Sequence, residues 1–191
     1  MVSVQEPTKE LIDRAKAVRS ASITLSQTTN LQRKDALRHM AVALDKWSTE
    51  IIKANKEDLD RSNSEGLNKA LLSRLKMDRM KLEGAIEGIR KVADLPDPIG
   101  IKQLNRELSQ GLILQRITVP LGVVGVIFEA RPDAAIQIAS LAVRSGNSAI
   151  LKGGSEAMCT NEVIIQALQE GLNKSNLPTQ SLCLLTTRTE S

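Results

Sequence analysis

The chain has 191 residues, of which 41% are hydrophobic and 25% are charged, with a formal net charge of +4. These proportions are those of a folded globular protein and exclude a disordered or fibrous chain. Trp47 and Phe128 are the only aromatic residues, and Lys and Arg are interleaved with Asp and Glu in the first half, so neither base stacking nor a basic patch is expected. We therefore expect no nucleic-acid partner.

The sequence contains no run approaching the ~18 apolar residues of a membrane span, and its first residues lack the apolar segment of a signal peptide. The two cysteines, Cys159 and Cys183, have neither CxxC spacing nor a neighbouring His. No metal site or disulfide is predicted from that pattern. We expect a cytoplasmic protein with no membrane partner.

Apolar residues recur at intervals of three and four from Thr8 to about Ala93, which predicts a run of amphipathic helices. Asn30, Ser48 and Asp78 are predicted N-caps, because their side-chain oxygens can accept from free backbone N–H groups. The clearest periodic series are Leu37, Met40, Ala41 and Leu44, and then Leu82, Ile86, Ile89 and Ala93.

Pro96 and Pro98 end the helical region, because proline lacks an amide donor and disfavours helix in the residue before it. From Leu104 to Val119, apolar and polar residues alternate around Gly111, which predicts two strands joined by a turn. The edges of such a hairpin are exposed unless a partner covers them.

After Pro120 the sequence alternates between strand and helix patterns. The apolar run 123–128 is typical of a strand buried on both faces of a parallel sheet. A helix over 134–143, a strand over 148–152, a helix to about 172 and a strand over 181–186 are predicted to follow. The sequence therefore predicts an α/β fold, in which N-terminal helices precede an incomplete Rossmann-like parallel sheet, with a projecting β-hairpin between them.

The segment LKGGSEA places Lys152 at the end of a strand, Gly153 and Gly154 in a turn, and Ser155 and Glu156 at the start of a helix. Ligands of open α/β sheets bind at that end of the strands. Glycines let a ligand approach the backbone, and free N–H groups at a helix start attract anions. The spacing is compatible with a nucleotide site, but the full GxGxxG fingerprint is missing, so spacing alone favours a well-formed turn without a ligand.

The segment FEARPD follows the neighbouring predicted strand, so its side chains are expected near Lys152 in one crevice. Arg131 is suited to bidentate contact with a carboxylate or a phosphate. The alternative is an ion pair of Arg131 with Glu129 or Asp133. At the level of composition both interpretations stay open.

The stretch 119–157, VPLGVVGVIFEARPDAAIQIASLAVRSGNSAILKGGSEA, resembles the gamma-glutamyl phosphate reductase family without interruption. ANKEDL (54–59), GLNKALLSRLKM (66–77) and VADLPDPIG (92–100) resemble the N-terminal region of that family. The resemblance covers essentially the whole chain and implies an aldehyde dehydrogenase-like fold. Its implied parts are the helical part of a cofactor domain (1–98), a β-hairpin used in oligomers (99–119) and an incomplete nucleotide-binding part (120–191).

By this resemblance, the activity is the NADPH-dependent reduction of L-glutamyl 5-phosphate to glutamate 5-semialdehyde in proline biosynthesis, with release of phosphate. The turn from Lys152 to Glu156 matches the superfamily's turn that holds the adenosine ribose of NADP(H). Arg131 is our hypothesis for a contact with the anionic substrate. The implied partners are a second copy, bound through the hairpin, and glutamate 5-kinase as a candidate.

The catalytic cysteine of this family belongs to the second half of its members, and neither Cys159 nor Cys183 matches its motif. Ala130 stands where the superfamily has an asparagine that stabilises the oxyanion. The final residues, TTRTES, also depart from the family, as after a premature end or a frameshift. We therefore expect a truncated, catalytically incomplete reductase. The alternative is a non-enzymatic fragment that binds nucleotide or docks onto full-length subunits.

Overall fold

The computed structural model describes residues 8–186, so the first seven residues and 187–191, which include most of the divergent TTRTES segment, lie outside the described residues. Within the described range, no helix is long and apolar enough to cross a membrane. The elements are α1 (Lys9–Ser26), α2 (Asn30–Lys46), α3 (Ser48–Ser64), α4 (Lys69–Leu75), α5 (Arg79–Asp94), β1 (Lys102–Ser109), β2 (Leu112–Ile117), β3 (Val123–Ile127), α6 (Pro132–Arg144), β4 (Ser148–Lys152), the 3-10 turn η1 (Ser155–Ala157), α7 (Met158–Lys174), the 3-10 turn η2 (Thr179–Ser181) and β5 (Leu182–Leu184).

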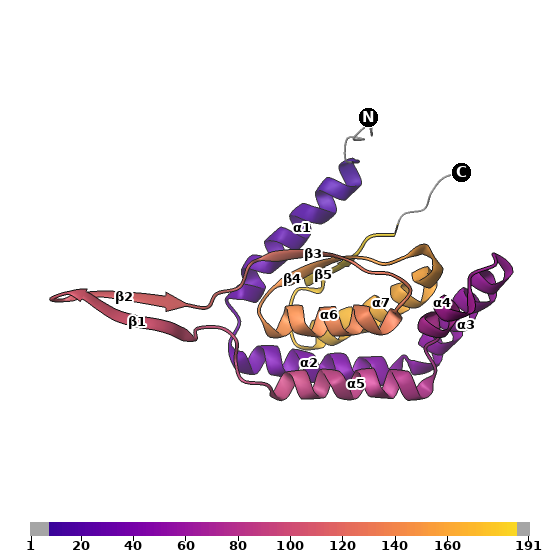
Figure 1. Ribbon diagram of the computed structural model, residues 1–191, viewed down its shortest axis with the longest axis horizontal. Helices are drawn as coiled ribbons and strands as arrows, with labels where there is room; N and C mark the ends of the chain where they lie inside the picture. Colours follow the sequence, from indigo (N-terminus) through magenta and orange to yellow (C-terminus); the bar gives the residue numbers. More distant parts are fainter. Residues whose placement is uncertain (1–7, 187–191) are drawn as a thin grey trace.

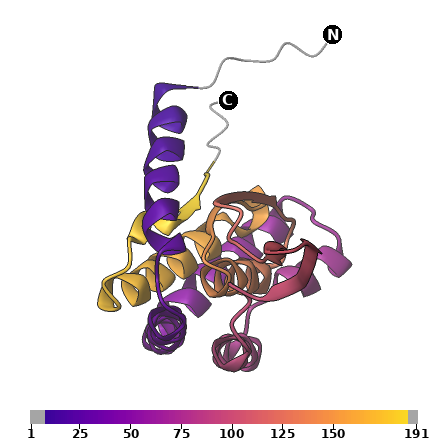
Figure 2. The ribbon, with the colours of Figure 1, turned by 90° about the vertical axis from the view of Figure 1, so that its left-hand side faces the viewer.

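Strands β3, β4 and β5 form a parallel sheet in that order, with Ile127 opposite Lys152 and Leu151 opposite Leu184. Helices α6 and α7 pack against β4 and β5, and α2 and α5 form a further layer beyond them (Figure 1). Helix α1 contacts the sheet and then extends past it (Figure 2). The predicted α/β class with a parallel sheet is confirmed.

The core is centred on α2, which packs against both α5 and α7. Gly171 permits the close approach of α7, because a Cβ at this position would lie 2.5 Å from the backbone N and Cα of Met40. Both of the clearest periodic series are buried: Leu37, Met40, Ala41, Leu44, Leu82, Ile86, Ile89 and Ala93. The same periodicity in α1 gives Leu11, Ala15 and Val18, of which only Val18 is buried.

Two of the three predicted N-caps are wrong by one residue. Thr29, not Asn30, caps α2, and it does so in a capping box. Helix α3 begins at Ser48 itself, with Trp47 at the N-cap position and no side-chain cap bond. Asp78 caps α5 as predicted. Thr29 and Asn30 offer the same acceptor chemistry, so only the backbone path decides which of the two lies just outside α2.

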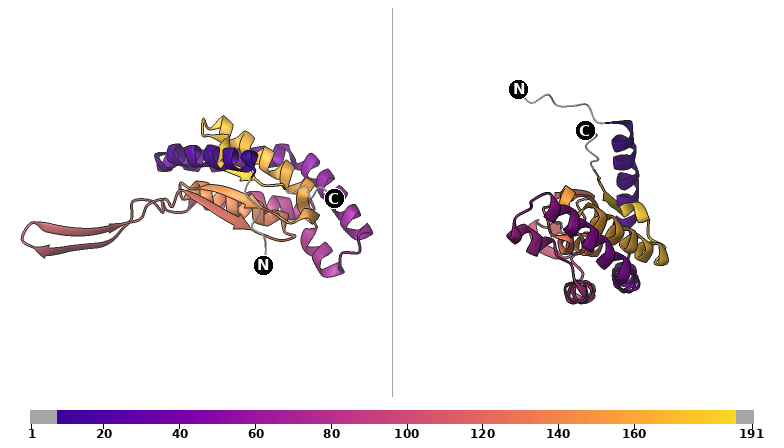
Figure 3. Two further views of the ribbon diagram at one scale, coloured as in Figure 1. Left: turned by 90° about the horizontal axis from the view of Figure 1, so that it is seen from above. Right: turned by 90° about the vertical axis from the view of Figure 1, so that its right-hand side faces the viewer.

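The hairpin of β1 and β2 is confirmed, with antiparallel pairing and Gly111 at φ +79° in its turn. Every residue of both strands is exposed, and the hairpin projects from the body (Figures 1 and 3). Its base is held where Asp97 accepts bonds of 2.7 and 2.8 Å from the buried Arg33. Burial opposes ionisation of Asp97, but the Ile99 N–H and Arg33 outweigh it and hold the pKa of Asp97 below its usual range.

The expectation that β3 is buried on both faces is wrong for the described residues. Ile127 is 85% exposed, and the other residues of β3 are half-buried or exposed. Within residues 8–186, β3 is an edge strand of the sheet, and the helices that cover the faces of the sheet pack mainly against β4 and β5. A continuous apolar run indicates that a strand is suited to burial, but it does not say which elements cover it.

Candidate functional site

The turn between β4 and α7 is tightly packed around its two glycines. A Cβ on Gly153 would lie 2.3 Å from Nδ2 of the buried Asn161, and one on Gly154 would lie 2.1 Å from Oε1 of Glu156. Asn161 cannot readily move away, so Gly153 needs to be glycine here. The Glu156 carboxylate is the free end of a flexible side chain that lies over Gly154. The glycines were predicted to let a ligand approach the backbone. In the structure, the side chains of Asn161 and Glu156 occupy the positions next to them.

Lys152 and the glycines line a small hollow together with Ser155, Met158, Asn161 and residues 184–186. The Lys152 ammonium donates to the carbonyl of Gly153 at 2.8 Å. Asn161 is 1% exposed, and its Oδ1 has no hydrogen-bond partner within the described residues. A buried acceptor without a partner costs about 1–3 kcal/mol. The hollow has a volume of about 10 Å³, so the protein itself encloses this acceptor.

Helix α3 supports this turn through Asp58, whose side chain is fully buried. The Asp58 carboxylate accepts from the Thr160 N–H at 2.7 Å, from the Thr160 hydroxyl at 2.6 Å and from the Cys159 N–H at 3.3 Å. These are free donors of the first turn of α7, and a negative charge is favourable at that end of a helix. Asp58 therefore caps α7 from a different helix.

Arg61, one turn further along α3, fixes the turn from its other side. Its guanidinium donates to the carbonyls of Ser155 at 3.0 Å and Glu156 at 3.3 Å, and to the Asp58 carboxylate. The sequence interpretation missed both Asp58 and Arg61 as parts of this site. The sequence did contain a signal for Asp58, which is a charged residue on the buried face of an amphipathic helix and lies within the ANKEDL motif.

Arg131 lies apart from this turn. The ends of β3 and β4 are neighbours, as predicted, but Arg131 lines a different hollow, between α5 and α6. Its guanidinium donates to the Asp133 carboxylate at 2.9 Å, which is one of the two ion pairs considered from the sequence. The expectation of a single crevice shared with Lys152 is therefore not met, because the side chain after Ala130 turns toward the helices.

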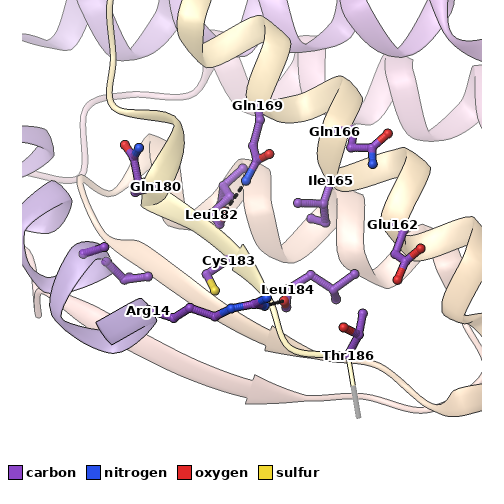
Figure 4. Close-up of a pocket in the computed structure, with 12 residues that line it drawn as sticks. Arg14, Glu162, Ile165, Gln166, Gln169, Gln180, Leu182, Cys183, Leu184 and Thr186 are labelled. Atoms are coloured by element: carbon purple, nitrogen blue, oxygen red, sulfur yellow. Dashed lines mark hydrogen bonds between the residues drawn. The ribbon is translucent and has the colours of Figure 1, made fainter. Parts of the chain in front are cut away.

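Cys159 lies in the first turn of α7 and accepts a hydrogen bond from the Arg61 guanidinium at 3.6 Å, which favours its thiolate, but burial outweighs this contact. Burial raises the pKa of the Cys159 thiol and of the Cys183 thiol, and the thiolate is the nucleophilic form. Cys183 lines a hollow between α1, α7 and β5 (Figure 4). In that hollow Arg14 and Gln169 donate to two backbone carbonyls of β5.

Comparison with known proteins agrees with this fold. No protein-family model matches the sequence. The gamma-glutamyl phosphate reductase of Parasynechococcus marenigrum (strain WH8102) is 61% identical over 191 residues, which is 100% of this chain and 44% of that protein. The crystal structure of gamma-glutamyl phosphate reductase from Thermotoga maritima is 32% identical with a TM-score of 0.89, over 93% of this chain and 43% of that one.

A more distant structure, a NAD-dependent benzaldehyde dehydrogenase from Corynebacterium glutamicum, is 16% identical with a TM-score of 0.73, over 97% of this chain and 38% of that one. At this identity the likeness shows the fold alone, and it confirms the predicted aldehyde dehydrogenase-like architecture. The chain spans less than half the length of the relatives it matches. The chain is therefore similar in sequence to gamma-glutamyl phosphate reductases over under half of their length.

Proposed function

We propose that this chain is the nucleotide-holding part of a gamma-glutamyl phosphate reductase, and that the turn from Lys152 to Glu156 holds the adenosine ribose of NADP(H). The observation that carries the proposal is the support of this turn from α3, where Asp58 and Arg61 bind the start of α7 and the carbonyls of Ser155 and Glu156. A turn fixed from two sides presents its donors and acceptors in one arrangement, as a binding site requires.

The side chains of the turn suit a ribose. Among residues 8–186, the one hydrogen-bond partner of the Lys152 ammonium is a backbone carbonyl of its own turn, so it can bond a ribose oxygen by a small rotation. The Glu156 carboxylate, at the free end of a flexible side chain beside Gly154, can accept from ribose hydroxyls. The nicotinamide cofactor, when bound, supplies the hydride.

The reaction we propose for the whole protein is the NADPH-dependent reduction of L-glutamyl 5-phosphate to glutamate 5-semialdehyde with release of phosphate. Support comes from the 61% identity over the chain. The nucleophile is proposed to come from elsewhere in the protein, because burial raises the pKa of both thiols here. We keep the division into 1–98, 99–119 and 120–191 as part of this proposal.

The hairpin is the proposed contact with a second copy. Its strands expose a set of large apolar side chains that a partner would cover, and a two-stranded sheet in water is marginal on its own. The set is Leu104, Leu108, Leu112, Ile113, Leu114 and Ile117. The partnership with glutamate 5-kinase and the cytoplasmic location stay predictions.

The experiment that tests the cofactor site is a titration of the purified chain with NADPH and NADH, followed by cofactor fluorescence. We expect NADPH to bind, and Lys152→Ala to weaken its binding about tenfold, the loss of one charged hydrogen bond. Lys91→Ala, an exposed lysine on α5, is the matched control and should bind as the unaltered chain does. A Lys152→Ala chain with unchanged NADPH affinity would count against the site.

A further inference from the structure

The hollow beside Arg131 is a feature that the cofactor proposal does not use. It has a volume of about 680 Å³ and lies between α4, α5 and α6. Pockets for small ligands commonly have about 300–1,000 Å³. The hollow is therefore large enough for a small metabolite, and its walls are on helices rather than on loops.

The floor of the hollow is open and apolar. Gly84 and Gly88 lie one turn apart on α5, and a Cβ at either would meet no atom within 4 Å. Ala85, Ile89 and Val92 line the same space from α5, with Leu141 on α6. A short aliphatic chain is suited to such a floor, because it removes apolar surface from water without leaving a polar group unpaired.

Three cations line the hollow: Arg74 and Lys81, from α4 and α5, and Arg131 at the start of α6. Two of them already have partners. Lys81 donates to the carbonyls of Ser73 and Lys76, and Arg131 donates to Asp133.

Arg74 differs from the other two. It lies in the last turn of α4, and among residues 8–186 it makes no hydrogen bond or salt bridge. The fork of donors on an arginine matches a carboxylate or a phosphate, so an unpaired Arg74 at a hollow of net positive charge is suited to an anionic ligand.

We propose that Arg74 is a substrate contact, which shares this hollow with Arg131 and binds an anionic group of a short aliphatic amino acid. The inference rests on the proposed function, because L-glutamyl 5-phosphate has such a chain with a carboxylate and a phosphate. It adds a specificity residue on α4 that lies 57 positions before Arg131 in the sequence. Arg131 can exchange Asp133 for the same ligand, whereas Arg74 has no bond to break.

The test is an NMR titration of the purified chain with L-glutamate as the probe, read at the backbone amides of Gly84 and Gly88. We expect saturable shifts at both glycines. Arg74→Gln should weaken binding about tenfold or more, while Arg74→Lys keeps the charge and should recover part of the affinity. Arg90→Gln, an exposed arginine on α5 outside the hollow, is the control and should leave the affinity unchanged.

A second variant distinguishes the loss of the binding site from the loss of the folded structure. Gly88→Leu removes a helix glycine and places a side chain into open space, so it should fold at least as well and fill the hollow. It should abolish the shift at Gly84. Unchanged L-glutamate affinity in Arg74→Gln, or no shift at either glycine in the unaltered chain, overturns the inference.

The same proteins are titrated with NADPH, which should bind Arg74→Gln as tightly as the unaltered chain. If NADPH binds but L-glutamate binding does not depend on Arg74, the substrate contact fails and the cofactor site stands. If L-glutamate binding depends on Arg74 but NADPH does not bind, the cofactor proposal fails and the anion contact stands.

Discussion

The junction of α3 with α7 and the hairpin of β1 and β2 use polar and apolar residues in opposite ways. At the junction, Asp58 is fully buried and each of its bonds satisfies a donor at the start of α7 or on Arg61. On the hairpin, leucines and isoleucines are exposed along both strands. Asp58 thus has its partners within the described residues, whereas the hairpin exposes apolar side chains of the kind that a partner covers.

This difference predicts where substitutions act. A buried carboxylate that holds one helix from another contributes to the stability of the single chain, and its removal leaves donors unpaired. An exposed apolar strand contributes little to the stability of the single chain, because its side chains are in water in both the folded and unfolded forms. Its contribution appears only on association.

The largest expected effect is at Asp58. Asp58→Ala removes the cap of α7 and leaves Arg61 without its carboxylate, which should lower the free energy of unfolding by about 3 kcal/mol. Urea denaturation measures the loss. Asp60→Asn, on the exposed side of the same helix, should change stability by less than about 0.5 kcal/mol. Equal effects of the two substitutions would show that the buried cap is unimportant.

Gly171→Ala should have the next largest effect on stability. The added methyl would lie 2.5 Å from backbone atoms of Met40, so α2 and α7 have to separate, at a cost of about 1–3 kcal/mol. Gly88→Ala is the matched helix glycine with no atom within 4 Å, and it should stabilise the chain by about 0.5–1 kcal/mol. The two thermal midpoints should therefore move in opposite directions.

Glu170 should make the stability of the chain depend on pH. Bonds from Lys46 and Trp47, and then from Lys174, lower the pKa of Glu170 from 4.5 to about 2. Because the folded pKa is depressed, this stabilisation is present above 4.5 and is lost as the pH falls toward 2. The stability difference between the unaltered chain and Glu170→Gln should shrink across that range. Trp47, the only tryptophan, provides the fluorescence signal. A difference independent of pH would contradict this assignment.

The smallest effect on stability is expected on the hairpin. Leu112→Thr with Leu114→Thr should change the free energy of unfolding by less than about 0.5 kcal/mol, since both side chains are exposed. The same double variant should reduce self-association, as measured by sedimentation. Leu31→Thr, at an exposed leucine of α2, is the control for a general loss of apolar surface. Stable monomers of the unaltered chain at high concentration would argue against the hairpin as a contact.

The sequence predicted well the features that depend on residues close along the chain. The 3.6-residue period placed the buried faces of α2 and α5, and Pro96 and Pro98 placed the end of α5, because these signals depend on residues close along the chain. The strand over 148–152 and the glycine turn after it were predicted for the same reason. The N-cap at Asn30 failed by one residue because the adjacent Thr29 offers equivalent chemistry, and the one at Ser48 failed because α3 begins at Ser48 without a side-chain cap.

The sequence by itself thus determined the helices, the strands, the hairpin and the glycine turn, since each follows from periodicity, turn residues or missing amide donors within a short segment. Only the tertiary structure decided that Asp58 and Arg61 support that turn across about 100 residues of chain, that Arg131 turns away from Lys152, and that Arg74 shares its hollow. These are contacts between distant segments, and they depend on how the helices pack rather than on what any segment prefers alone.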